Sequence, residues 1–300
     1  MPEEMRDVFG KTLVELGLEY PNVLVLDADL HTSSKALYFK QAFPDRFIQC
    51  GIAEQNMFGI AAGLATQGYI PFPSTFAVFA AKRALDQVSI SIAYPKLNVK
   101  IPGSYVGIPT SRAGASHNAV EDMAIMRGMP HMLVADPGDN HELRSLMRAA
   151  VLTEGPVYFR ITRYTLTDLF DASYVFAWGR GARLHEGADV TLIGTGMMTA
   201  FCLQAAEILA RDHIEAEVLH CGSVKPIDAD LIAASARKTR AVVTAENASV
   251  VGGLGSAVAE VLGERAPATL RRVGVQDRFI ESGGVSELLA QHRMRPEDIA

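Results

Sequence analysis

The sequence predicts an α/β protein of two domains, each built on a largely parallel sheet flanked by helices. Its 300 residues suffice for two domains of roughly 150 residues each. Short apolar strands alternate with helical segments over most of the chain, which is the pattern of parallel sheets covered on both faces. The alternation breaks once, over residues 166–184, where glycine and polar residues replace the periodic pattern. We therefore expect a first domain at 1–165, a linker at 166–184 and a second domain at 185–300.

The first domain is expected to begin with an amphipathic helix and to continue as alternating strands and helices. In chain order the expected elements are helix 6–20, strand 22–30, strand 46–50, helix 51–65, a strand, proline-bounded turn and helix within 69–93, strand 97–103, and a strand, helix and strand within 131–163. Residues 104–122 have the glycine, serine and proline content of a long loop. In the second domain, helices separate four expected strands at 188–196, 215–220, 240–247 and 268–275.

Composition and charge exclude several classes of protein. Hydrophobic residues make up 49% of the chain and charged residues 21%, with a net charge of −6. This mild acidity lacks the basic surface of a nucleic-acid-binding protein, and no apolar run reaches the roughly 18 residues that span a membrane. The N-terminal MPEEMRDVFG lacks the basic-then-apolar pattern of a signal peptide. We expect a cytoplasmic protein with no nucleic-acid or membrane partner.

The cysteines and histidines show no catalytic or metal-binding pattern. Cys50, Cys202 and Cys221 lie in apolar contexts without paired spacing, as expected of reduced core residues in a cytosolic protein. No local signature supports a catalytic thiol. The eight histidines are scattered, and none has the spacing of metal ligands. We therefore expect no metal site built from this chain's own residues.

Glu54 is the only carboxylate in the stretch GIAEQNMFGIAAGLA, where it precedes a helix of small and apolar residues. One interpretation is a first-turn acid that satisfies free amide groups and the helix dipole. The small residues that follow, among them Gly59 and Gly63, would let another backbone approach closely, which favours a buried helix pair across a subunit interface. A carboxyl group at such an interface would be placed to hydrogen-bond a ring nitrogen of a ligand.

Phe76 and Phe79 are spaced three residues apart, which places both rings on one face of the expected helix. Two aromatic residues with this spacing usually belong to the core. The alternative is a flat apolar wall on which an aromatic ligand stacks.

Several polar residues follow expected strands, at the sheet edge where ligands of parallel sheets bind. His117, in a loop that opens a helix, is either a solvated loop residue or a proton-transfer group. Asp27 and Asp29 follow a strand in the same way. Arg160 and Arg163 end the last strand of the first domain, where a pair of arginines favours an anion pocket.

Two glycine-rich turns are interpreted as packing features. GTGMMT, from Gly194 to Thr199, has a threonine where a dinucleotide-binding fingerprint needs its third glycine, which argues against a nicotinamide oxidoreductase. GGLG, from Gly252 to Gly255, opens a helix and could hold an anion, but packing is the simpler explanation.

In their order and spacing, these motifs resemble the C-terminal half of transketolase and of 1-deoxy-D-xylulose-5-phosphate synthase, enzymes that use thiamine diphosphate. The resemblance covers nearly the whole chain and is carried by DADL, GIAEQNM, PSTFAVF, GASHN, GPVYFRITR, and VTAEN followed by GGLGSAVAE. It implies that the first domain binds the pyrimidine of the cofactor and that the second is a transketolase C-terminal domain.

The resemblance implies a role for each candidate residue at the cofactor. Glu54 supplies a proton or a strong hydrogen bond to a pyrimidine ring nitrogen, so the protein tunes the tautomer of the cofactor. Phe76 and Phe79 lie along the pyrimidine face. Asp29 falls where the family's acid contacts the cofactor and the dimer interface.

The resemblance also implies roles at the substrate. His117 falls on the histidine near the reacting hydroxyls of the sugar, a general acid–base position. Arg6, Ser33 and Arg163 fall on positions that hold a sugar phosphate, a role that suits bidentate arginine.

The chain departs from the family at three positions. Ala113 replaces an acid that reads acceptor stereochemistry, and the histidine that helps to hold phosphate has no clear counterpart near Tyr105. Lys82 stands where the third aromatic residue of the pyrimidine wall belongs. The acceptor therefore need not be a standard pentose phosphate, and whether the substrates are phosphorylated stays open.

The chain also lacks the Gly-Asp-Gly to Asn segment that holds magnesium and diphosphate in the family. The resemblance therefore implies a separate N-terminal subunit that carries this site, and an α2β2 assembly with each active site between one partner chain and this one. The expected cofactors are thiamine diphosphate and Mg²⁺, with the metal held mainly by the partner subunit.

The expected function is that of a thiamine diphosphate-dependent transketolase subunit, which moves a two-carbon ketol unit from a ketose or ketose phosphate to an aldose. One alternative is a decarboxylating relative, similar to the synthase or to the beta subunit of 2-oxo acid dehydrogenases. The motif GIAEQN is closer to the corresponding motif of the synthase. Another is a non-catalytic scaffold that kept the fold, against which Glu54 and His117 argue.

Overall fold

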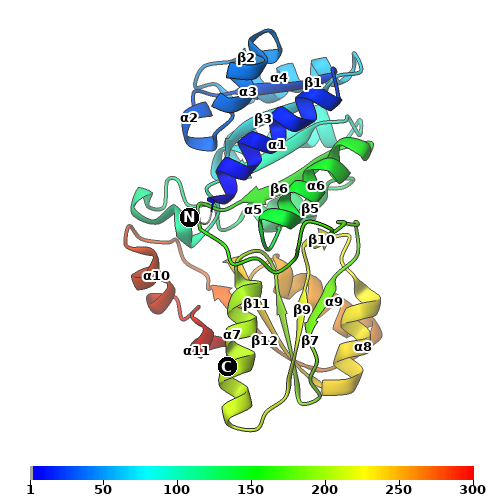
Figure 1. The fold of residues 1–300 in the computed structure, drawn as a ribbon, viewed down its shortest axis with the longest axis vertical. Helices are drawn as coiled ribbons and strands as arrows, with labels where there is room; N and C mark the ends of the chain where they lie inside the picture. The colour runs from blue at the N-terminus through cyan, green and yellow to red at the C-terminus, as the bar shows by residue number, and fades with distance from the viewer. Residues whose placement is uncertain (1–2) are drawn as a thin grey trace.

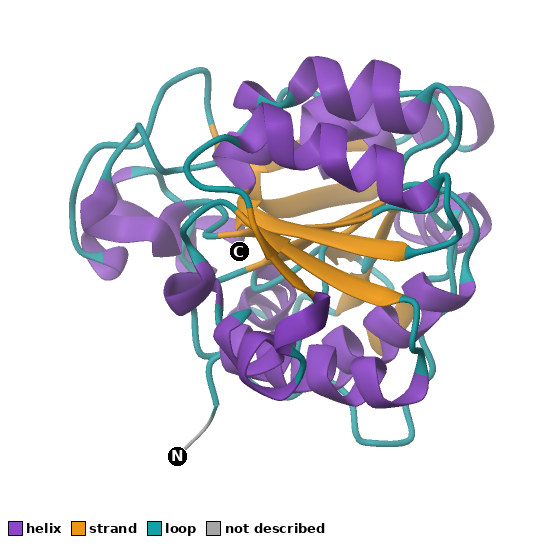
Figure 2. Cartoon of the chain, turned by 90° about the horizontal axis from the view of Figure 1, so that it is seen from above, coloured by secondary structure: helices purple, strands orange, loops and turns teal. Residues whose placement is uncertain are grey.

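Two mainly parallel sheets, one above the other along the long axis of the molecule, organise the chain (Figure 1). This computed structural model describes residues 3–300, so the first two residues of the predicted first domain lie outside the described residues. Helices cover both faces of the sheets (Figure 2). The predicted architecture, two α/β domains with largely parallel sheets, is confirmed.

The upper sheet has seven strands in the order β10-β5-β6-β4-β3-β1-β2. Its strands are β1 (Val23–Asp27), β2 (Phe47–Gln49), β3 (Ile70–Phe76), β4 (Lys100–Ser104), β5 (Leu133–Ala135), β6 (Val157–Ile161) and β10 (Ser223–Lys225). Every residue of β1, β3, β4 and β6 is buried, because helices pack on both faces of these strands. The accompanying helices are α1 (Met5–Glu19), α2 (His31–Ser34), α3 (Leu37–Ala42), η1 (Pro44–Arg46), α4 (Glu54–Ala65), η2 (Phe79–Arg83), η3 (Gln87–Ala93), η4 (Ile108–Ala113), α5 (Asp122–Gly128) and α6 (Asn140–Leu152).

The lower sheet has five strands in the order β12-β11-β8-β9-β7. They are β7 (Ala182–His185), β8 (Val190–Gly194), β9 (Ala216–His220), β11 (Ala241–Ser249) and β12 (Thr269–Val275). The helices of this half are α7 (Met198–Arg211), α8 (Ala229–Thr239), α9 (Leu254–Arg265), α10 (Val285–Gln291) and α11 (Pro296–Ile299).

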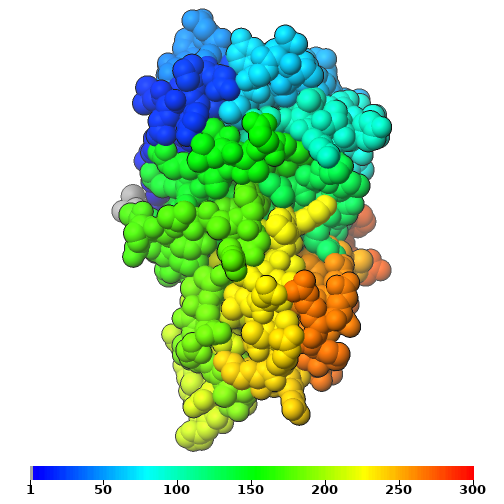
Figure 3. Space-filling view, turned by 90° about the vertical axis from the view of Figure 1, so that its right-hand side faces the viewer, coloured from blue at the N-terminus to red at the C-terminus, as the bar shows by residue number. Residues whose placement is uncertain are grey.

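Two short strands depart from the predicted organisation. β7 begins within the residues assigned to the linker and pairs antiparallel with β9. β10 comes from the second half of the chain, yet it pairs antiparallel with β5 at the edge of the first sheet. Figure 3 shows the yellow residues of the second domain reaching up beside the green residues of the first. Strands of three or four residues show too little periodicity to be read from sequence.

The segment 69–93 folds differently from the prediction at one important point. Phe76 is the last residue of β3, so it does not share a helix with Phe79, and the prediction of one helix face is wrong. The chain then winds as two π-helical segments, η2 and η3. In η2 the amide of Ala84 donates to the carbonyl of Phe79, five residues earlier.

Arg160 joins the two domains, so the prediction that it belongs to an anion pocket is wrong. Its fully buried guanidinium donates to Asp122 at 2.9 Å, to Asp136 at 2.9 Å and to the backbone carbonyl of Asn247 at 2.9 Å. The positive charge is thus satisfied inside the molecule and is closed to a ligand. Burial raises the pKa of Asp136, and the guanidinium opposes this rise.

Both glycine-rich turns are packing features, as the sequence predicted. Gly196, at φ 52°, lies so close to Asp136 that a Cβ atom would come within 2.6 Å of its carboxylate. At the start of α9, the amides of Leu254 and Gly255 donate to Glu246 at 2.7 and 2.8 Å. The anion at this helix end is therefore the chain's own side chain.

Candidate active site

The candidate site lies at the carboxyl ends of the central strands of the upper sheet. Phe76 ends β3 and is paired with Ser104 at the end of β4, which is paired in turn with Ile161 at the end of β6. Loops that follow parallel strands meet at this edge, which is where such sheets bind ligands. The sequence-predicted residues from distant parts of the first domain converge here.

Four rings form one cluster at this edge. The ring centroids of Phe76 and Phe79 lie 5.7 Å apart with an interplanar angle of 23°, and Tyr105 stacks on Phe76 at 4.1 Å. His117 meets Phe76 at 5.9 Å and Phe79 at 5.5 Å, in both cases edge-on. The structure thus brings the predicted wall and the predicted proton-transfer residue together, and adds Tyr105.

Glu54 is the first residue of α4 and is only 4% exposed. Its carboxylate accepts a hydrogen bond from Arg83 at 3.2 Å. The guanidinium carbon of Arg83 lies 3.8 Å from the centroid of the Phe79 ring. Arg83 therefore connects the carboxylate to the aromatic wall.

Arg83 is a site residue that sequence reasoning missed. The sequence pointed to Lys82 as the residue in the third wall position, but Lys82 turns away and pairs with Glu121 at 2.7 Å. The reason is the π-helical winding of η2, which closes its hydrogen bonds five residues apart and so shifts which side chains share a face. Nothing in the sequence pattern signals this winding.

A cavity of about 420 Å³ opens beside Glu54. Its lining comes from the residues just before and at the start of α4, together with Arg83: Ile52, Ala53, Glu54, Gln55, Asn56 and Arg83. A buried carboxylate and a guanidinium line this cavity, and the guanidinium stacks on the Phe79 ring. These are groups that recognise a planar, nitrogen-containing ligand.

The residues predicted to hold a sugar phosphate surround Tyr105. Arg6 donates to the Tyr105 hydroxyl at 3.0 Å and to the backbone carbonyl of Ser33 at 3.2 Å, and it pairs with Glu4 at 2.6 Å. The exposed Arg163 lies 5.4 Å above the Tyr105 ring. Two cations therefore flank one phenol.

Asp29 and Asp27 play different structural parts. Asp29 is exposed, at φ 63°, and its amide donates to the side chain of Gln49 at 3.1 Å. Asp27 is buried, and its carboxylate accepts from the amide of Leu30, from the ring of His31 and from Gln49. Asp27 thus fixes the turn that presents Asp29, and Leu30 in this turn packs against the aromatic cluster.

Other chemistry finds little support in the part of the chain that the structure describes. Burial raises the pKa of Cys202 and of Cys221 to about 12, so neither thiol ionises near neutral pH. Within residues 3–300, no group of three or more acidic, histidine or cysteine side chains is arranged to hold a metal ion. Over the same residues, no helix has both the length and the apolar character that crossing a membrane requires.

Comparison with known families decides the assignment. Residues 2–167 match the transketolase pyrimidine-binding domain, and residues 179–299 match the transketolase C-terminal domain. The chain belongs to the transketolase family. The resemblance inferred from the motifs is therefore confirmed.

Several relatives of similar length are subunits of divided transketolases. The chain is 47% identical over 279 residues to the 6-deoxy-6-sulfo-D-fructose transketolase subunit SqwH of Clostridium sp. (strain MSTE9), covering 93% of this chain and 87% of the relative. It is 34% identical to an apulose-4-phosphate transketolase subunit of Phocaeicola vulgatus, covering 98% and 94%. It is also 36% identical to the 1-deoxy-D-xylulose-5-phosphate synthase of Symbiobacterium thermophilum, but it spans only 45% of that enzyme.

A solved structure of the same kind has nearly the same fold. A split-gene transketolase, described as an inactive beta4 tetramer, superposes with a TM-score of 0.92 at 49% identity, covering 98% of this chain and 95% of that one. Over nearly its whole length, this transketolase-family chain is thus similar to a split transketolase subunit.

Proposed function

We propose that this chain forms the pyrimidine half of a thiamine diphosphate site whose other half belongs to an N-terminal partner subunit. The observation that carries the proposal is that buried Glu54 and Arg83 line one cavity, with Arg83 stacked on the ring of Phe79. These groups fit an aminopyrimidine ring. The diphosphate and Mg²⁺ are assigned to the partner, because the resemblance implies that the family's magnesium segment is missing from this sequence.

The residues of this chain have different proposed roles at the cofactor. When bound, thiamine diphosphate supplies the carbon nucleophile for cleaving and forming the ketose carbon–carbon bond. Glu54 shares a proton with a pyrimidine nitrogen, and Phe76 and Phe79 hold the ring in place. Asp29 is proposed to contact the cofactor and the dimer interface from the neighbouring turn.

His117 is proposed to move a proton at a hydroxyl oxygen of the sugar. Its Nδ1 lies 2.8 Å from the hydroxyl of Ser116, which orients the ring and leaves Nε2 for substrate. The donor is a ketose and the acceptor an aldose, with transfer of a two-carbon ketol unit between them.

The terminal anion of the sugar is proposed to bind at Arg6 and Arg163, with Ser33 and Tyr105 beside them. The Tyr105 hydroxyl already accepts from Arg6. A phosphate or a sulfonate would suit this set, and the relatives named above include subunits for a sulfo sugar and for a sugar phosphate.

The assembly proposed is α2β2, with the outer face of α4 at the contact between copies of this chain. Gly59 and Gly63 are exposed there and have open space around them. We further propose that the chain works in the cytoplasm, in keeping with its free cysteines. The proposed boundaries remain 1–165 for the pyrimidine domain, 166–184 for the linker and 185–300 for the C-terminal domain.

Reconstitution with the partner subunit tests this function. With thiamine diphosphate and Mg²⁺, the pair should transfer a ketol unit from hydroxypyruvate or a ketose phosphate, and should not use pyruvate. Glu54→Gln should lower kcat at least 100-fold, because the amide cannot share the proton in the same way. An unchanged rate in this variant would favour a scaffold role, and consumption of pyruvate would favour a decarboxylating enzyme.

A further inference from the structure

We propose that Asn247, in the second domain, is a positioning residue for the loop of residues 105–119 in the first domain. This inference rests on the proposed function, because it takes Tyr105 and His117, near the two ends of this loop, as residues that face substrate. Asn247 itself forms its side-chain hydrogen bonds with Val106 and Ile108 and does not line the cavity beside Glu54. Its proposed effect is therefore indirect, through the loop.

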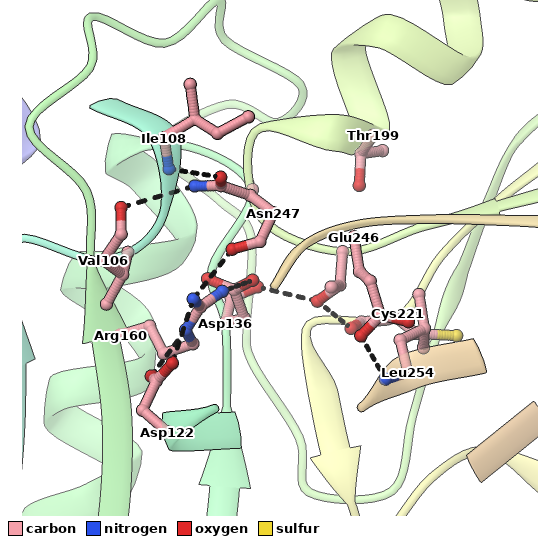
Figure 4. Close-up of polar contacts among 12 residues, drawn as sticks. Val106, Ile108, Asp122, Asp136, Arg160, Thr199, Cys221, Glu246, Asn247 and Leu254 are labelled. Carbon is pink, nitrogen blue, oxygen red and sulfur yellow. Dashed lines mark hydrogen bonds and ion pairs between the residues drawn. The ribbon is translucent and has the colours of Figure 1, made fainter. Parts of the chain in front are cut away.

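The side chain of Asn247 is 2% exposed, and both its oxygen and its nitrogen form hydrogen bonds at the junction between the domains (Figure 4). Its Oδ1 accepts from the amide of Ile108 at 2.9 Å, and its Nδ2 donates to the carbonyl of Val106 at 3.4 Å. Its own backbone carbonyl accepts from Arg160, which is anchored to Asp122 and Asp136. The side-chain amide of Asn247 is thus held in place, and it hydrogen-bonds the loop on both sides of Gly107.

Gly107 makes this grip possible. It adopts φ 58°, a conformation that side chains rarely tolerate, and a Cβ atom there would lie 2.2 Å from Oδ1 of Asn247. The loop backbone therefore lies directly against the amide, and neither can move independently.

Further bonds transmit the position of residues 106–108 to both ends of the loop. The amide of Gly107 donates to the carbonyl of Ala119 at 2.8 Å, and the hydroxyl of Thr110 donates to the carbonyl of Tyr105 at 2.6 Å. His117 is two residues before Ala119. A shift at the base of the loop would therefore displace Tyr105 and His117 relative to Phe76, which ends β3, and Phe79, which begins η2.

The second domain also supports the far side of the loop. The hydroxyl of Ser111 donates to the carbonyl of Gly283 at 3.0 Å, and Gly114 packs against Ser282. Figure 1 shows α10, in red, beside this part of the loop. The C-terminal domain thus contacts the loop of residues 105–119 at residues 106–108 and again at Ser111 and Gly114. These contacts give that domain a part in substrate positioning.

The test compares Asn247→Ala with Glu246→Gln in the reconstituted enzyme. Glu246 is the preceding residue on β11 and is equally buried, but its carboxylate caps α9 and does not contact the loop. Asn247→Ala should lower kcat/KM for the ketol donor about 10- to 100-fold, mainly through KM, because small displacements of positioned groups carry penalties of this size. The thiamine diphosphate concentration for half-maximal activity should change less than about twofold.

Glu246→Gln should lose thermal stability but keep its KM, which separates positioning from general weakening of the second domain. Gly107→Ala disrupts the same contact from the loop side and should raise KM in the same way. It serves as the test variant if Asn247→Ala folds poorly. A folded Asn247→Ala enzyme with wild-type KM, or the same KM change in Glu246→Gln, would overturn the proposal.

Hydrogen exchange tests the proposal independently of activity. In the isolated chain, Asn247→Ala should speed exchange in peptides covering residues 105–113 and leave β3 and α4 protected as in wild type. Unchanged protection of this loop would also overturn the proposal. If the wild-type pair shows no ketol transfer, or Glu54→Gln stays active, the proposed function fails, and the exchange result still decides whether Asn247 holds the loop.

Discussion

Arg83 contacts both the carboxylate of Glu54 and the ring of Phe79, so one side chain connects the two groups that are proposed to bind the cofactor ring. Its charge faces Glu54 at 3.2 Å, and its flat guanidinium covers Phe79 at 3.8 Å. The side chain is about half exposed, and so a ligand entering from solvent meets it first. We infer that it forms part of the cofactor platform.

Arg83→Ala should raise the thiamine diphosphate concentration for half-maximal activity about tenfold, with a smaller change in kcat. A stacked cation and a partly exposed ion pair together contribute roughly 1 to 1.5 kcal/mol, which corresponds to this factor. Titration of activity with the cofactor measures it. Lys82→Ala is the matched control, since that neighbour turns away, and it should stay within about twofold of wild type. Equal or tighter cofactor binding by Arg83→Ala would show that Arg83 competes with the ligand.

The sequence identified the proposed site residues more readily than their surroundings. Glu54, Phe76, Phe79 and His117 could be picked out because the family motifs carry them. Without the resemblance, the strand-end pattern could not separate Arg160 from Arg163, because what distinguishes them is burial: Arg160 is enclosed between domains and Arg163 is exposed. Burial of this kind depends on contacts between residues far apart in the chain.

At the level of elements, the start of α9 shows how a buried acid can replace a capping residue. The N-terminus of α9 has no side-chain cap of its own, and Glu246 on β11 accepts from its first amides instead. Burial raises the pKa of Glu246 from its ordinary 4.5 to about 7, although these two amide bonds oppose the shift. The helix cap therefore changes protonation within the physiological range of pH.

This raised pKa predicts a pH-dependent stability. The folded chain keeps the Glu246 proton between pH 4.5 and about 7, where the unfolded chain has released it. Its contribution is thus fully present below pH 4.5 and is lost as the pH rises through about 7. The free energy of unfolding should fall by up to about 3 kcal/mol from this group.

Urea denaturation at pH 5 and at pH 8 measures the effect. Glu246→Gln should flatten the difference in unfolding free energy between the two pH values. Glu260→Gln, on the outer side of the same helix and paired with Arg127, should retain the wild-type difference. Identical slopes in both variants would rule out Glu246 as the titrating group.

Element prediction succeeded for long periodic segments and failed for short or irregular ones. The helix beginning at Met5 has enough residues to show its period, and the buried strand at Val23 is marked by a continuous apolar run. β10 has three residues, and the π-helical winding of η2 has no sequence signature. β10 extends the upper sheet with a strand from the second domain, and η2 places Arg83 at the candidate site.

For the whole molecule, the surface of α4 bears on assembly. Its outward glycines lie near the segment that exposes Ile90 by 60% and Tyr94 by 78%, and Ile52 before the helix is 75% exposed. Apolar side chains around open glycines are typical of a surface that another helix covers. We infer that the copies of this chain meet here.

Gly63→Arg should block this contact, because a long charged side chain would stand where the partner backbone approaches. Analytical ultracentrifugation of the reconstituted enzyme should then show a species of about half the wild-type mass, as expected if an α2β2 assembly separates into αβ pairs. Gly263→Arg is a matched control: Gly263 is also an exposed helical glycine with open space around it, on α9 of the second domain. Assembly of Gly63→Arg to the wild-type mass would exclude α4 as the interface.

The pairing of β10 with β5 limits how a gene for this protein could be divided. A break anywhere between residues 166 and 184 would send β10 to a different polypeptide from the sheet that it completes. The first fragment would then expose the backbone of β5 as a free edge, which invites aggregation. Two separate products would therefore have to reassociate through this strand pairing and through the contact of Arg160 with Asn247.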